Sequence, residues 1–210
     1  INNISIGGNA MDALTSGADN VAIGRDAAGA TTIGCHNVAI GCGALKSSTT
    51  SADNRGQIAI GEMAMGTGVA TGSMNIAIGC AAGAAITSGY RNVFVGRMAG
   101  DSVNTGFHNV GIGENAFGAA TTGCYNVAIG NLALGTCGCY NTFVGESTGA
   151  SITAGHNNGY VGRTAGENPE VGGNRSNAIA LGNESSTNFY ATIALTVVSD
   201  ARDKTDVSDL

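Results

Sequence analysis

Short apolar segments recur along the whole chain, each opened by asparagine or another polar residue and closed by glycine. Asn20–Gly24 reads NVAIG, and Asn109–Gly113 reads NVGIG. Two β-branched residues that alternate around a small one predict a short strand with its β-branched side chains on one face. The closing glycines are Gly7, Gly24, Gly41, Gly61, Gly79, Gly96, Gly113, Gly130, Gly145, Gly162 and Gly182.

These glycines follow one another at steps of 17, 17, 20, 18, 17, 17, 17, 15, 17 and 20 residues. A nearly fixed period of this length is the sequence signature of a repeat architecture. The pattern therefore predicts an all-β fold, a parallel β-solenoid or β-roll of about eleven repeats of about 17 residues. Three such chains would form a homotrimeric fibre, and an interwoven triple β-helix is the alternative arrangement. Helices are not expected, because glycine interrupts every run with helical spacing.

The third and the fourth residue after each closing glycine show different sequence constraints. The third residue is alanine in nearly every copy, which predicts a close approach of another part of the chain. The fourth residue varies and is interpreted as part of a second short strand that faces a more tolerant space. Its large members are Met11, Leu45, Met65, Phe117 and Leu134. A Thr/Ser/Gly segment then predicts a turn at the end of each unit.

The asparagine that opens each strand allows two structural interpretations. It could adopt the left-handed backbone conformation of a turn, or its amide could form one rung of an asparagine ladder along the stack. Both interpretations are structural, so a ligand-binding role is not expected for this position.

Composition limits the partners and cofactors. The chain has only nine Lys and Arg residues and a formal net charge of −6, which leaves no basic surface for nucleic acid. No apolar run approaches the roughly 18 residues of a membrane helix, so membrane insertion is not expected. The glycine-rich segment Gly66–Gly72 is explained by the repeat, and no nucleotide or other cofactor is predicted.

Alanine and glycine dominate the repeats, so a single chain has few large apolar side chains to bury. This composition favours trimerisation as part of folding.

Cysteine and histidine occur just before the repeated asparagine in several copies. Cys124 and Cys139 share one position of the repeat, interpreted as a place for a mid-sized apolar residue. Because stacked strands would bring equivalent Cα atoms to about 4.8 Å, a disulfide between them is the alternative. One histidine column of a trimer could bind a metal, but surface or packing roles are favoured, and no metal is predicted. The histidines are His36, His108 and His156.

Acidic residues do not form a paired catalytic site in the sequence. Glu62, Glu114 and Glu146 each follow a closing glycine, but they belong to separate repeats. A glycosidase needs two carboxylates flanking one bond. The column is therefore interpreted as solvated, and no depolymerising enzyme is predicted.

Changes of pattern divide the chain into three parts. The glycine-rich repeats cover residues 1–182, a terminal β segment without glycine covers residues 183–198, and a polar module begins at residues 199–210. One step of 20 residues contains extra loop residues between Lys46 and Gly56. We expect this insertion on the outer face of the stack, where solenoids commonly bind partners.

The array from Asn3 to Gly182, with its NVAIG and TTG elements, is similar to repeats in bacteriophage tail fibres. More loosely, it resembles the heads of trimeric autotransporter adhesins. In both groups short parallel strands stack into a β-roll, so the resemblance implies a homotrimeric fibre.

The motif SDARDK at Ser199–Lys204 resembles the opening of the self-cleaving intramolecular chaperone domain that ends many phage tailspikes and fibres, including endosialidase. The resemblance implies that Ser199 and Lys204 form a catalytic dyad that cuts the chain between Val198 and Ser199 after trimerisation. A desolvated lysine with a lowered pKa can serve as the base for serine without a histidine. Asp203 stands where many members carry leucine, which changes local packing but not the dyad. A polar C-terminal tail is the alternative.

The expected function is therefore structural and host-receptor recognition in a phage tail fibre, located on the virion. Expected partners are two further copies of the chain, upstream fibre or tail proteins, and a carbohydrate receptor on the host cell. No enzyme activity is expected apart from the autoproteolysis. The alternatives are a bacterial trimeric adhesin head and an ice-binding β-solenoid, the latter suggested by recurrent threonines such as Thr87 and Thr153.

Overall fold

The computed structural model describes residues 2–48, 55–135, 138–167, 176–183 and 185–186. Its regular secondary structure consists of short β-strands, each of three residues. They are β1 (Ile4–Ile6), β2 (Val21–Ile23), β3 (Val38–Ile40), β4 (Ile58–Ile60), β5 (Ile76–Ile78), β6 (Val93–Val95), β7 (Val110–Ile112), β8 (Val127–Ile129), β9 (Thr142–Val144), β10 (Gly159–Val161) and β11 (Ile179–Leu181). No helix occurs among the described residues, as the interrupted pattern predicts.

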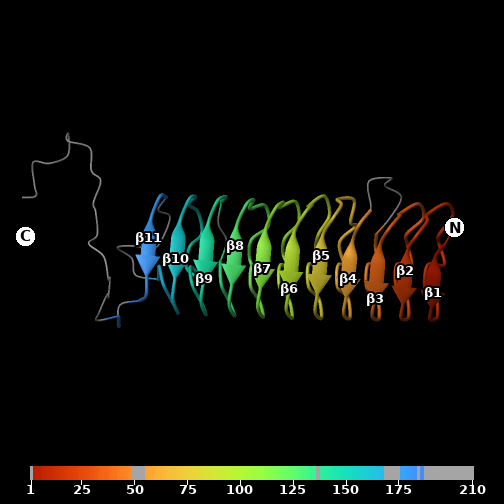
Figure 1. Cartoon of the computed structure of the whole chain (residues 1–210), viewed down its shortest axis with the longest axis horizontal. Helices are drawn as coiled ribbons and strands as arrows, with labels where there is room; N and C mark the ends of the chain where they lie inside the picture. The colour runs from red at the N-terminus through yellow and green to blue at the C-terminus, as the bar shows by residue number, and fades with distance from the viewer. Residues whose placement is uncertain (1, 49–54, 136–137, 168–175, 184, 187–210) are drawn as a thin grey trace, which may run out of the picture.

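The strands form one parallel sheet in sequence order, from β1 to β11. Figure 1 shows them side by side with all arrows pointing the same way, each joined to the next by one turn of the coil. The register is constant between repeats, so that Val110 pairs with Val127 and Gly111 with Ala128. Each strand pairs with neighbours of its own chain, which is the stacked β-solenoid and not an interwoven helix. The predicted repeat, the all-β class and the parallel β-solenoid are confirmed, whereas the homotrimeric fibre stays a prediction.

The middle residue of each strand points into the coil, while the two flanking residues point outward. In β2 the central Ala22 is fully buried, whereas Ile23 is exposed. The same pattern holds from β2 to β8, where the central residues are alanine, phenylalanine or glycine. The β-branched side chains therefore lie on one face, as predicted, and that face is the outer one.

The predicted second strand is wrong. Met11, Leu45, Met65, Phe117 and Leu134 all have positive φ angles, between 47° and 66°. A strand requires strongly negative φ, so this part of each repeat forms a tight turn that points the side chain inward. Sequence reasoning failed here because a large apolar residue that is buried by a turn looks the same as one that is buried by a strand.

This inward residue compensates in volume for the middle residue of the strand. Phe94 at the centre of β6 is followed six residues later by Gly100, and a Cβ on Gly100 would lie 2.5 Å from the phenylalanine ring. In the next turn the sizes are exchanged, because Gly111 precedes the buried Phe117. In these two turns one large side chain thus faces a glycine, which keeps the interior close-packed.

The alanine column is buried as expected, and the closing glycines are required by the stacking. Ala44 and Ala99 are fully buried. At Gly24, φ is 132°, and a Cβ there would lie 2.6 Å from the carbonyl oxygen of Gly41 in the next turn. Only glycine combines this backbone angle with such a close approach.

The last described strand, β11, ends at Leu181, and the boundary at residue 182 stays a prediction. The inserted loop at Lys46–Gly56 and the terminal segments 183–198 and 199–210 fall mostly outside the described residues. Within the part of the chain that the structure describes, no helix is long and apolar enough to cross a bilayer.

Candidate interaction surfaces

The repeated asparagines form a buried ladder along the coil. The side-chain oxygen of Asn92 accepts the backbone N–H of Asn109 at 3.0 Å and its Nδ2 amide at 3.0 Å. The same Nδ2 of Asn109 also donates to the carbonyl of Gly123 at 2.8 Å. Asn109 is fully buried. These contacts recur along the array, so the ladder interpretation is confirmed and the side chains are occupied by structural bonds.

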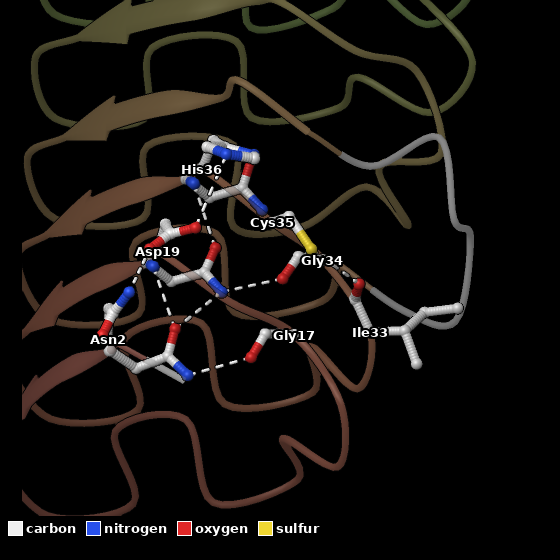
Figure 2. A network of polar contacts seen from close by, with 10 residues as sticks. Asn2, Gly17, Asp19, Ile33, Gly34, Cys35 and His36 are labelled. Atoms are coloured by element: carbon white, nitrogen blue, oxygen red, sulfur yellow. Dashed lines mark hydrogen bonds and ion pairs between the residues drawn. The ribbon is translucent and has the colours of Figure 1, made fainter.

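The left-handed backbone conformation belongs to the residue before each ladder asparagine. His36, Tyr125 and Asn157 have φ angles of 59°, 54° and 57°. Figure 2 shows the N-terminal part of the ladder, where Asn2 and Asp19 form a second, exposed row of polar side chains with His36. In that row Asn2 donates to Asp19 at 3.1 Å, and His36 lies 3.6 Å from the same carboxylate.

Two columns of side chains cover the outer face of the sheet, and nearly all of them are aliphatic. We call this surface the sheet face. The column at the end of each strand is aliphatic in every repeat and includes Ile112, which is 39% exposed, and Val161, which is 47% exposed. Its members are Ile6, Ile23, Ile40, Ile60, Ile78, Val95, Ile112, Ile129, Val144, Val161 and Leu181. A continuous aliphatic surface of this kind marks an interaction site in a folded protein.

Aromatic rings stack at the edge of the sheet face, just before the asparagine ladder. His108 stacks on Tyr125 with ring centroids 4.9 Å apart, and Tyr125 stacks on Tyr140 at 5.2 Å. In the neighbouring column Tyr90 stacks on Phe107 at 5.0 Å. The sequence pattern did not predict stacking of these rings between turns, although their recurrence at two adjacent positions of the repeat was the available signal.

Cys124 and Cys139 form a disulfide, with Cα atoms 4.6 Å apart. The bond joins two adjacent turns at the position where the sequence alternative placed it, so the apolar interpretation is wrong for this pair. It also connects the turns across the 15-residue step, the shortest in the array. Cys35, Cys42 and Cys80 are free.

The three histidines lie in different surroundings and do not converge. His36 faces Asp19, His108 belongs to the aromatic stack, and the Nδ1 atom of His156 lies 3.0 Å from the hydroxyl of Ser176. Among the described residues, no group of three or more His, Cys, Asp and Glu side chains could hold a metal ion.

The residues that follow the closing glycines form ion pairs between turns. Arg97 pairs with Glu114, and Glu146 lies 3.3 Å from Arg163. The acidic column is exposed, as expected, and two of its members, Glu114 and Glu146, are paired with arginines of neighbouring turns. Each exposed pair of this type contributes little to stability, up to about 1 kcal/mol.

Several threonine hydroxyls are used within the coil. Thr15 donates to the carbonyl of Thr32 at 3.0 Å, and Thr87 donates to the carbonyl of Asn104 at 3.2 Å. An ice-binding surface would need a regular array of hydroxyls available to water, so these contacts do not favour that alternative.

The predicted catalytic pair, Ser199 and Lys204, lies outside the described residues together with the cleavage position at Val198. The structure therefore neither brings the two side chains together nor separates them.

Comparisons with known proteins give no relative from which function could be transferred. No protein-family model, no curated protein and no solved structure matches the chain.

Proposed function

We propose that the chain is a segment of a phage tail fibre that acts as a homotrimeric rod and presents a receptor-binding surface to the host cell. The observation that carries the proposal is the sheet face, an uninterrupted aliphatic column that extends along all eleven strands. A monomer would leave this surface in water, whereas three parallel copies would bury it along a common axis.

The geometry of the coil suits a mechanical role. Eleven strands at the usual parallel spacing give a rod of about 50 Å. Backbone hydrogen bonds and the asparagine ladder join each turn to the next, so the rod has no weak plane between described repeats.

The disulfide between Cys124 and Cys139 agrees with the proposed location. Disulfides persist in oxidising surroundings, and a tail fibre works outside the cell after release. The same bond would also suit an adhesin head on a bacterial surface, which therefore stays the alternative.

Maturation by self-cleavage is the second part of the proposal. The hydroxyl of Ser199 would attack the carbonyl carbon of Val198 while Lys204 accepts its proton. The Val198–Ser199 amide bond would then break as the acyl group moves to the serine oxygen, and the freed amine would take up the proton. Water would hydrolyse the resulting ester to leave the Val198 carboxylate and the free Ser199 hydroxyl. This step would release the fibre from its chaperone after the three chains have assembled. It rests on the SDARDK motif alone.

The test is to express the chain with its natural downstream sequence and to compare the wild type with Ser199→Ala and Lys204→Ala. We expect the wild type to be shortened to a product that ends at Val198, while both variants keep full length on a denaturing gel. Asp203→Leu serves as the control and should be cut like the wild type. An uncut wild type, or cleavage in both dyad variants, would refute the dyad.

A further inference from the structure

A shallow groove follows the coil and is lined by residues of the turns, none of which belongs to a strand. It has a volume of about 390 Å³ and extends over four consecutive turns, those that follow β6, β7, β8 and β9. Three spacings between turns give it a length of about 14 Å. One wall comes from the second residue after each closing glycine, and the other comes from the fifth and sixth residues.

The groove exists because side chains are missing at its centre. The fifth residue after the closing glycine is Asp101, Gly118, Gly135 and Ala150 in the four turns. Only here do two consecutive described turns have glycine at this position, so no side chain fills the space. The turn after β8 is also two residues shorter than its neighbours. Both signals are present in the sequence, but their combined effect requires the stacking of the turns.

The lining combines apolar surface with a few polar groups. Met98 and Leu132 supply aliphatic contacts, while Asn115 and Ser147 supply an amide and a hydroxyl. This composition is typical of ligand sites, where apolar contact gives area and a few polar groups fix orientation.

Asp101 adds a carboxylate at one end of the groove. The hydroxyl of Ser102 donates to this carboxylate at 3.4 Å, and burial raises the pKa of the Asp101 carboxyl. No cationic side chain occurs among the described residues that line the groove. Arg97 reaches the sulfur of Met98 at 3.1 Å, but its guanidinium already pairs with Glu114. An anionic ligand would therefore meet the Asp101 carboxylate without a free cation among the lining residues, whereas hydroxyl groups would find acceptors.

We propose that this groove binds a neutral oligosaccharide of two or three pyranose rings. The aliphatic side chains contact the C–H faces of the sugar rings, and Asp101, Asn115 and Ser147 bind the hydroxyl groups. Acidic sugars are excluded by the missing cation. The proposal rests on the host-recognition role proposed above and identifies its receptor class and its position on the rod.

The test uses the purified chain and four trisaccharide probes. Cellotriose, maltotriose and chitotriose are neutral, and sialyllactose carries a carboxylate. Binding is measured by isothermal titration and by the shifts of protein NMR signals. We expect millimolar or tighter binding of at least one neutral probe and no binding of sialyllactose, with shifts confined to the groove.

Two variants test the position of the site, each with a matched control. Ala119 lies exposed at the rim, so Ala119→Trp should fill the groove without disturbing the core. Ala85 occupies the same position two turns earlier and lies outside the groove, which makes Ala85→Trp its control. Asp101→Asn should weaken binding about tenfold because a charge-assisted hydrogen bond is lost. Asp12→Asn changes the equivalent residue of the first turn and should have no effect.

The outcomes separate this proposal from the fibre proposal. Loss of binding in Ala119→Trp and its retention in Ala85→Trp would support the groove. No binding of any neutral probe, equal binding by all four variants, or a preference for sialyllactose would overturn it. The fibre role is tested separately, by the mass of the trimer and by cleavage before Ser199. The binding results do not bear on either measurement.

Discussion

The volume balance between Phe94 and Gly100 makes a prediction at the scale of single residues. Phe94→Ala should destabilise the protein by about 3–5 kcal/mol, because a buried ring leaves a cavity. Gly100→Leu alone should also destabilise strongly, since Gly100 has no room for a side chain beside the ring. In the double variant the leucine fills the cavity, as Leu45 does beside Ala39. We therefore expect the double variant to unfold at higher denaturant concentration than Phe94→Ala.

The informative result is a change in the sign of the effect that Gly100→Leu has on stability. A buried leucine contributes about 1.5–3 kcal/mol, and its positive φ angle costs on the order of 1 kcal/mol. The effect of Gly100→Leu on stability should thus be unfavourable in the wild type and favourable in the Phe94→Ala background, at one fixed protein concentration. If the two effects simply add, the volume balance is not what determines these positions.

At the scale of the structural element, the asparagine ladder should contribute strongly to stability. Asn109→Ala would remove the bonds to Asn92 and Gly123 and leave the backbone N–H of Asn126 without the side-chain oxygen it meets at 3.1 Å. Each buried polar group left unpaired costs about 1–3 kcal/mol. We expect a loss of several kcal/mol in denaturant unfolding and faster hydrogen exchange at the Asn126 amide.

Asn3→Ala provides the control for this prediction. Asn3 makes the same contact to Gly17, at 2.9 Å, but it belongs to the first described turn and is only half-buried. Water can replace its bonds, so the loss of stability should be clearly smaller than for Asn109→Ala. Equal losses at the two positions would mean that burial of the ladder is not the source of its strength.

The limits of sequence reasoning are also clearest at the scale of the element. Strand positions and register could be predicted, because the opening asparagine and closing glycine mark both ends of every strand. The turn around Met65 could not be predicted in this way. Periodicity indicates that a residue is buried, but it does not indicate the φ angle of that residue. Gln57 replaces asparagine in the ladder before a turn that is one residue longer, and its Nε2 amide still donates to the carbonyl of Gly72. Such a compensation is visible only when the turns are stacked.

For the whole molecule, the sequence could predict one apolar face but not which way it points. The pair Val110 and Ile112 alternates with a small residue, and either side of the strand could in principle line the coil. The narrow interior decides, because one central side chain per strand already fills it, as Phe94 and Phe143 show. The larger aliphatic surface therefore stays on the outer face, where the proposed trimer would bury it. The candidate groove also could not be predicted from the sequence, because it forms only where four turns lie side by side.

The sheet face leads to the last prediction, that Ile112→Asp abolishes the trimer while each chain keeps its fold. Ile112 is 39% exposed in the single chain, so a carboxylate there stays hydrated and does not disturb the coil. In a parallel trimer, however, three such carboxylates would meet near the common axis, where desolvation and mutual repulsion oppose assembly. Native mass measurement should show a fall from three chains to one, with an unchanged circular dichroism spectrum. Thr122→Asp places the same charge on an exposed residue of the same repeat and should leave three chains together. A trimer that survives Ile112→Asp would show that the chains assemble through another surface.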